Sequence, residues 1–171
     1  MAAPTFTLSE QNGSGAGSVT DTITSIVFAS ADLNSNTGSL ATGHPITAGN
    51  NSYEKYNKLK VTGTASNSLS AFGAYFSSTA PTDQASSSSF ITMYFSTNAS
   101  YVAPVATVSS VATTLCSTVT TSGGATSLTY PANSVNAYSG YITQQMQTAS
   151  GATGGNVTFA SPWLNVGYTY S

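Results

Sequence analysis

The alternation of hydrophobic and polar residues predicts short β-strands along most of the chain. Side chains on a strand point alternately to its two faces, so a period of two marks a strand with one buried face. The clearest alternation runs over residues 58–64, where Leu59 and Val61 share one face and polar residues occupy the other. Residues 137–148 alternate in the same way.

Further strands are predicted wherever this pattern, or a short apolar run, recurs. They cover residues 4–10, 22–29, 69–77, 90–96, 156–160 and 163–170, with one or two more within 101–121. Residues 22–29 carry apolar side chains on both faces, as in a strand covered on both sides. We therefore expect short strands along most of the chain and no helix. This spacing predicts an all-β fold with a single antiparallel β-sandwich, Ig-like or jelly-roll-like, and a barrel as the second choice.

The first twenty residues form a segment of their own in this interpretation. Phe6 and Leu8 share one face of a short strand, and residues 11–19, rich in glycine, serine and asparagine, indicate a loose tether. We expect residues 1–20 to be an N-terminal arm or an edge strand and residues 21–171 to be the sandwich domain. An arm would add to a neighbouring subunit's sheet and bury Phe6 and Leu8 there. An edge strand would join the sheet of its own domain.

The composition changes the picture through its lack of charge. Only 5% of the 171 residues are charged, against roughly 25% in an ordinary domain, and arginine is absent. Serine and threonine make up about a third of the chain. Such a surface is typical of β structure. It also favours a protein that packs against neighbours, because no charge has to be desolvated there. No apolar run approaches the roughly 18 residues of a membrane-spanning helix, so we expect no membrane.

The residues able to do acid–base or metal chemistry are few and scattered. They are Glu10, Asp21, Asp32, His44, Glu54, Asp83 and Cys116. Asp21 and Asp32 lie close enough in sequence to approach each other, but no motif joins them. One histidine and one cysteine are too few for a zinc site. We therefore expect no catalytic centre, cofactor or metal, and we expect Cys116 to be a buried apolar side chain rather than an intersubunit bridge.

Two other groups of residues suggest contacts with partners. The three lysines, Lys55, Lys58 and Lys60, lie within six residues and suggest a contact with an acidic patch of a partner subunit. Alternatively, they protect an exposed strand edge from pairing. With a net charge of −2 and no arginine, nucleic acid is not an expected partner.

Aromatic residues suggest a carbohydrate-binding module as an alternative, because rings stack on sugar faces. The candidates are Tyr53, Tyr56, Tyr101, Tyr138, Tyr141 and Trp163. Core or interface packing is the competing explanation for these rings.

Three stretches of sequence resemble a group of small virion structural proteins of tailed phages. They read Ser-Tyr-Glu-Lys-Tyr-Asn-Lys-Leu-Lys-Val-Thr-Gly-Thr at 52–64, Tyr-Val-Ala-Pro-Val-Ala-Thr-Val-Ser-Ser-Val-Ala-Thr-Thr at 101–114 and Tyr-Ser-Gly-Tyr-Ile-Thr-Gln-Gln-Met-Gln at 138–147. The likeness covers roughly residues 50–171 and lies in strands and turns. It implies a β-sandwich on the particle surface, of the capsid decoration or cement type, and no functional residues.

The resulting expectation is a non-enzymatic virion protein. It would bind the major capsid protein or other virion subunits, as a homo-oligomer on the particle, with Phe6, Leu8, Lys55, Lys58 and Lys60 as contacts. The N-terminus lacks a basic start and an apolar core, so we expect synthesis in the host cytoplasm without a signal peptide and a final location on the capsid surface. A phage tail or fibre component and a carbohydrate-binding adhesin module are the alternatives.

Overall fold

The computed structural model describes most of the chain, and almost all of its regular structure is β. The described residues are 3–13, 18–37, 40–64, 69–76, 82–83, 90–108, 110–121, 125–129, 134–152, 157–158 and 164–170. The strands are β1 (Thr5–Glu10), β2 (Lys55–Gly63), β3 (Leu69–Phe76), β4 (Thr82–Asp83), β5 (Ile91–Asn98), β6 (Thr114–Leu115), β7 (Thr126–Ser127), β8 (Tyr141–Thr148), β9 (Val157–Thr158) and β10 (Leu164–Tyr170). Helical structure there includes a short helix, α1 (Leu40–Gly43), and a 3-10 turn at Cys116–Thr118.

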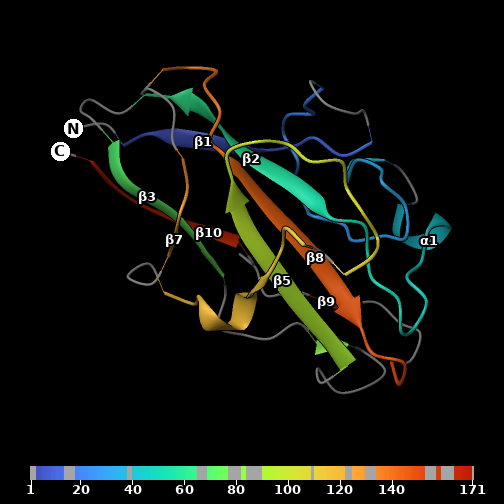
Figure 1. The fold of residues 1–171 in the computed structure, drawn as a ribbon. Coiled ribbons are helices and arrows are strands. Elements are labelled where there is room, and N and C mark those ends of the chain that lie inside the picture. Colours follow the sequence, from blue (N-terminus) through green and yellow to red (C-terminus); the bar gives the residue numbers. More distant parts are fainter. Residues whose placement is uncertain are drawn as a thin grey trace.

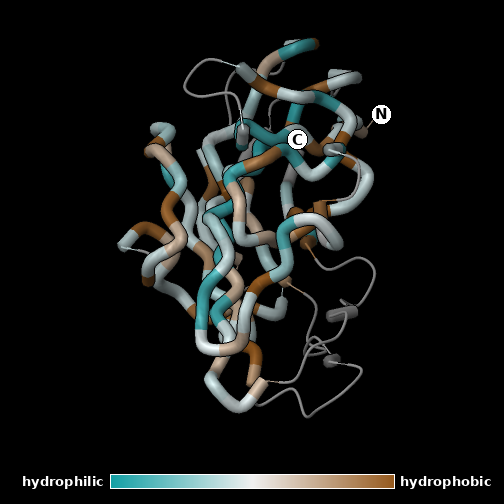
Figure 2. The backbone as a smooth tube through the Cα atoms, turned by 90° about the vertical axis from the view of Figure 1, so that its right-hand side faces the viewer, coloured by the Kyte–Doolittle hydropathy of each residue, from teal (hydrophilic) through white to brown (hydrophobic). Residues whose placement is uncertain are grey.

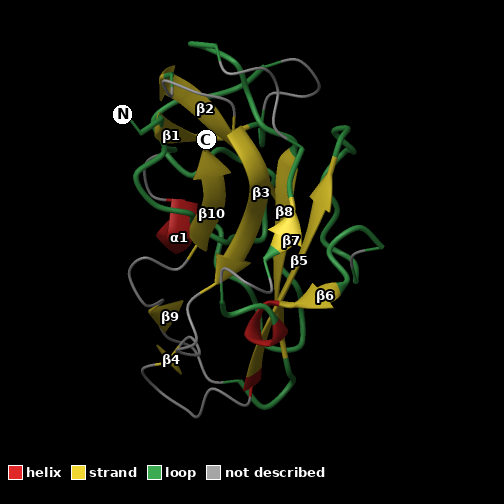
Figure 3. Cartoon of the chain, turned by 90° about the vertical axis from the view of Figure 1, so that its left-hand side faces the viewer, coloured by secondary structure: helices red, strands yellow, loops and turns green. Residues whose placement is uncertain are grey.

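Two antiparallel sheets form the body of the molecule. The larger has the strand order β1-β2-β8-β5-β6, and the smaller has the order β10-β3-β7. Strands β4 and β9 pair separately. Figure 3 shows β3 and β10 as a layer beside β8 and β5, and Figure 1 shows α1 at the right of the view, on the opposite side from β3. The predicted all-β sandwich is therefore confirmed.

The core lies between the two sheets, as the period of two requires. On β5 the inward positions are Ile91, Met93 and Phe95, and all three are buried. The ring of Phe95 lies 4.5 Å from that of Phe76 on β3, in an edge-on arrangement that aromatic pairs favour. Hydrophobic and hydrophilic residues follow one another along the described chain without a long apolar stretch (Figure 2). No helix among the described residues has the length and apolar character needed to cross a membrane.

The first strand belongs to the sheet of its own chain. β1 runs antiparallel to β2, with Leu8 opposite Leu59. Phe6 and Leu8 pack against the core. The free side of β1 is partly covered too, because Glu10 and Thr20 exchange backbone hydrogen bonds. Within this chain, Thr5–Glu10 is thus an edge strand of the five-stranded sheet.

One of the predicted strands, at residues 22–29, is wrong. Residues 22–29 hold buried apolar side chains, but their backbone bonds go to separate places: Ile23 N donates to the Leu8 carbonyl, and Tyr53 N donates to the Ala29 carbonyl. No single strand forms a continuous series of backbone hydrogen bonds with residues 22–29, so they do not form a strand. Among the described residues of 101–121, β6 is the one strand, in agreement with the lower of the two numbers expected there, but it is short. The long strands were predicted correctly, within a few residues at each end.

Candidate functional site

Polar side chains are buried where β1, β2 and β8 adjoin. A polar group that leaves water costs free energy unless it finds a hydrogen-bond partner. The buried polar residues in and beside these strands are Ser9, Glu10, Gln11, Asn12, Ser52, Glu54, Lys55, Asn57, Ser139, Thr143, Gln144 and Gln145. Several of their hydrogen bonds reach the loops that cover the two faces of the sheet.

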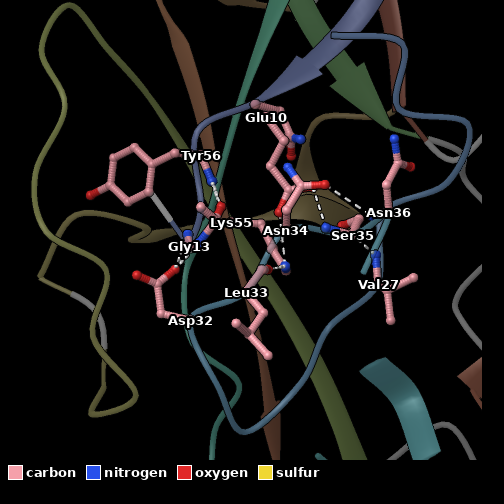
Figure 4. Close-up of polar contacts among 12 residues, drawn as sticks. Glu10, Gly13, Val27, Asp32, Leu33, Asn34, Ser35, Asn36, Lys55 and Tyr56 are labelled. Atoms are coloured by element: carbon pink, nitrogen blue, oxygen red, sulfur yellow. Dashed lines mark hydrogen bonds and ion pairs between the residues drawn. The ribbon is translucent and has the colours of Figure 1, made fainter. Parts of the chain in front are cut away.

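On the inner face, a buried ion pair holds a loop against the sheet. Lys55 Nζ lies 2.8 Å from Glu10 Oε1, and both side chains are fully buried. Lys55 Nζ also donates to the Leu33 carbonyl at 2.6 Å, and Ser35 N donates to Glu10 Oε2 at 3.1 Å (Figure 4). Because Lys55 points inward, it is not available to a partner, and the prediction was wrong at this residue.

Beside this pair, Asn12 connects three segments with one amide. Its Nδ2 donates to Asp32 Oδ1 at 2.8 Å and to the Glu54 carbonyl at 2.6 Å, while its Oδ1 accepts from Tyr56 N at 2.8 Å. Gly13 follows with a φ of 79°, which favours glycine, and its N–H donates to Asp32 at 3.2 Å. Asp32 therefore serves the turn, while Asp21 has different partners, so the structure does not pair these two carboxylates.

On the outer face, side chains of the sheet hold the loop at residues 101–108. Glu54 N donates to the Val105 carbonyl at 3.1 Å, and Val105 N donates back to Glu54 Oε2 at 3.3 Å. Gln145 Nε2 donates to the Thr107 carbonyl at 2.7 Å. These bonds explain why the loop is not a strand: two side chains and one isolated backbone N–H bind its backbone, and no neighbouring strand forms a continuous ladder with it.

Three of the tyrosines considered for sugar binding meet under this loop. The ring of Tyr56 lies 5.1 Å from Tyr101 and 5.8 Å from Tyr141. Tyr56 is fully buried and Tyr141 is only 6% exposed. Burial, and next the carboxylate of Glu54, raise the pKa of Tyr56, so its phenol stays neutral. The cluster is mainly a packing unit, and its two buried rings offer no stacking platform.

Lys58 lies at the exposed margin of this cluster. Its Nζ is 4.0 Å from the centre of the Tyr141 ring and 5.5 Å from that of Tyr138. Ring faces carry negative potential and attract an ammonium group. The side chain is partly exposed on the outer face of β2, so it can reach a partner.

Lys60, on the same face, is already paired. Its Nζ lies 2.6 Å from Asp21 Oδ2, and Asp21 also accepts from Ser9 and Tyr138. Burial works to raise the pKa of Asp21, but the hydrogen bonds from Lys60, Ser9 and Tyr138 outweigh it and lower that pKa. The bond to Asp21 raises the pKa of Lys60. The pair holds the segment around Asp21 against β2. Because Asp21 neutralises the charge of Lys60, Lys60 is less suited than Lys58 to bind an anion of a partner.

The lysines do not protect a sheet edge. β2 lies between β1 and β8, so it is an interior strand, and the edge explanation is wrong for these residues. Tyr53 is partly exposed, whereas Trp163 and the side chain of Asp83 lie outside the described residues.

The other candidates for chemistry stand apart. His44 is exposed just after α1, and Cys116 is buried in the core. Burial raises the pKa of the Cys116 thiol. Among the described residues, no group of three or more histidine, cysteine, aspartate or glutamate side chains is placed to hold a metal ion.

The sequence interpretation missed the buried polar cluster. The alternation and the loop signals do not predict that Glu10, Asn12 and Glu54 are buried, and charged and amide side chains seldom are. One signal was present: Lys55 and Asn57 continue the alternation that puts Leu59 on the inner face of β2. Extending that alternation by four residues, from Leu59 back to Lys55, places both side chains inside.

Comparison of the chain with protein-family models, with curated proteins and with solved structures gave no match.

Proposed function

We propose that this chain is a non-enzymatic structural protein of a tailed-phage particle, which decorates the outer surface of the capsid and stabilises the shell. The sequence resemblance over residues 50–171 suggests the particle. The observation that carries the proposal is the placement of charge: Glu10, Glu54 and Lys55 are fully buried, and Asp21 is paired with Lys60. The described surface is therefore mostly hydroxyl, amide and apolar.

Such a surface suits close packing against other subunits. Burying a charge in an interface costs free energy unless it is paired there, whereas hydroxyls and amides exchange one hydrogen-bond partner for another. Three valines of the loop at 101–108 are also exposed: Val102 at 48%, Val105 at 39% and Val108 at 71%. Exposed apolar residues close together favour contact with another protein.

A decoration protein that binds only the assembled shell stabilises it by mass action. The test is to purify particles of the phage that encodes the chain and to compare them with particles from which its gene has been deleted. We expect the chain in many copies per particle and a lower temperature of DNA release without it, restored by adding the recombinant chain. Absence from the particles would refute the proposal, and a few copies confined to the tail would favour a tail or fibre component.

A carbohydrate-binding module receives less support. Three of its candidate rings do gather, but burial of Tyr56 and Tyr141 leaves Tyr101 as the partly exposed member of that cluster. Tyr138 is partly exposed beside Lys58. Binding of the chain to host surface glycans, in the absence of any particle, would favour this second function.

A further inference from the structure

Lys58 differs from the other two lysines in its partners. Lys55 is paired with Glu10 at 2.8 Å, and Lys60 is paired with Asp21 at 2.6 Å. Within the described residues, Lys58 forms no ion pair, and its contacts are with the rings of Tyr138 and Tyr141. Ring faces orient an ammonium group but do not neutralise it. Lys58 therefore presents one uncompensated positive charge in a held position.

We propose that Lys58 is the receptor for an aspartate or glutamate carboxylate of a different protein in the particle. This inference rests on the proposed function and adds the chemistry of the partner. A fixed, partly desolvated ammonium gains most from an anion that completes its hydrogen bonds. Nucleic acid fits poorly, because it needs several phosphate contacts and this face offers one free cation among the described side chains.

A second copy of the chain does not supply the carboxylate from its described side chains. Glu10 and Glu54 are fully buried, Asp21 is held by Lys60, and Asp32 is held by the turn at Asn12. The described carboxylates of a second copy are thus engaged, so we take a protein of another kind as the partner, and a cross-link from Lys58 to Asp83 of a second copy would contradict this proposal.

The surroundings of Lys58 have the arrangement of a protein interface. Tyr141, beneath Lys58, contacts Tyr101 at 6.1 Å between ring centres, and Tyr101 begins the loop that carries the exposed valines. Interfaces commonly combine an apolar centre with charged groups at the rim. In such an interface, the ion pair at Lys58 fixes how the partner is oriented, and the exposed valines contribute the apolar contact area.

Zero-length carbodiimide cross-linking of intact particles tests this directly, because the reagent joins an ammonium group only to a carboxylate in contact with it. We expect mass spectrometry to find Lys58 linked to an aspartate or glutamate of another virion protein. Lys60 should link to Asp21 within the chain, as an internal control. The variant Lys58→Arg should still bind and should lose the cross-link, since a guanidinium group is not acylated.

The contribution of Lys58 to affinity is measured from the Kd with which purified variants bind to particles that lack the chain. We expect Lys58→Gln to bind about tenfold more weakly, as for loss of one interfacial ion pair. The double variant Lys58→Gln with Asn50→Lys, which keeps the net charge but moves it, should be equally weak. Far-UV circular dichroism confirms that each variant is folded.

The outcomes separate this inference from the proposed function. A chain that is found on the particles but has no cross-link at Lys58, or one only to a second copy, overturns the carboxylate receptor and leaves the structural role standing. Unchanged binding of Lys58→Gln overturns it too. Absence of the chain from the particles refutes both.

Discussion

Glu10 and Lys55 bring two opposite charges into the protein interior, where each depends on the other. A buried ion pair adds little stability compared with apolar side chains of the same volume, but removal of one partner leaves a buried charge uncompensated. Here each member also binds the loop backbone, at Leu33 and Ser35. The pair thereby determines where a loop without regular structure lies.

Substitution of one partner is expected to be costly. In Lys55→Gln, Glu10 remains buried without its cation, so we expect the free energy of unfolding at pH 7 to fall by about 3–5 kcal/mol. The double variant Glu10→Gln with Lys55→Gln leaves no buried charge and should lose less. Urea denaturation of both variants measures the difference. A double variant less stable than the single one would contradict this account.

Cys116 should be unreactive while the protein is folded. The side chain is 1% exposed, and burial raises the pKa of its thiol, so both access and thiolate are lacking. We expect labelling by a disulfide reagent at pH 8 to follow the rate of unfolding and to become rapid in urea. Rapid labelling of the native protein would show that the core around β5 and β3 opens.

At the scale of elements, β1 and the segment after it depend on contacts far along the chain. The aromatic ring of Phe6 lies 5.6 Å from Phe72 on β3 and 5.7 Å from Tyr168 on β10. The first strand therefore contacts both sheets. A strand with such contacts contributes to folding of the whole domain and is not a detachable tether.

Phe6→Ala should destabilise the fold and not merely weaken association. The ring is partly buried between two aromatic side chains, so we expect a loss of about 2–3 kcal/mol, toward the lower end for such truncations. Thr7→Ala, on the opposite face of β1, is the matched control and should change stability by less than about 0.5 kcal/mol. Thermal denaturation distinguishes the two. Equal stability of Phe6→Ala and the native protein would return support to a free arm.

Asp21 should make stability depend on pH in acid. Its pKa is lowered in the folded protein, so its contribution to stability is fully present above the ordinary aspartate pKa of 3.8 and is lost as the pH falls through the lower pKa of the folded protein. Asp21→Asn should therefore be less stable than the native chain near neutral pH, and the two should converge as the pH falls below that window. Urea midpoints measured from pH 7 to pH 2 give the comparison. If the urea midpoints of Asp21→Asn and the native chain differed by the same amount from pH 7 to pH 2, the lowered pKa of Asp21 could not be the cause of the difference.

At the scale of the whole molecule, the few charges are used mainly inside or in pairs. Exposed charges separated by more than about 10 Å are screened at 0.1 M salt, while a buried pair such as Glu10–Lys55 is screened much less. Long-range electrostatics therefore contribute little to how this protein meets its neighbours. Association must therefore depend on shape complementarity, hydrogen bonds and apolar contacts.

Association with the particle should accordingly depend weakly on salt. With Lys58 as the unpaired lysine among the described residues, we expect the Kd to change by less than about tenfold between 0.1 M and 1 M sodium chloride. Sedimentation of the chain with particles at both concentrations measures this. Complete release at 1 M salt would mean that several ion pairs, and not one, hold the contact.

The amino-acid sequence by itself determined the fold class and the faces of the long strands. The period of two in β2, β5 and β8 identifies their inward residues, because a pleated strand alternates its side chains whatever surrounds it. The separation of Lys58 and Lys60 from Leu59 and Val61 was predictable for the same reason.

Tertiary structure alone decided which polar residues are buried and where the irregular segments lie. Glu10 and Lys55 can be buried only because the fold brings these two residues, far apart in the sequence, into contact. The local sequence pattern around either residue does not predict that contact. In the same way, residues 101–108 have local strand propensity, but the side chains of Glu54 and Gln145 bind the Val105 N–H and the Thr107 carbonyl. A backbone group takes whichever partner the fold provides, so the outcome depends on long-range contacts rather than on neighbouring residues.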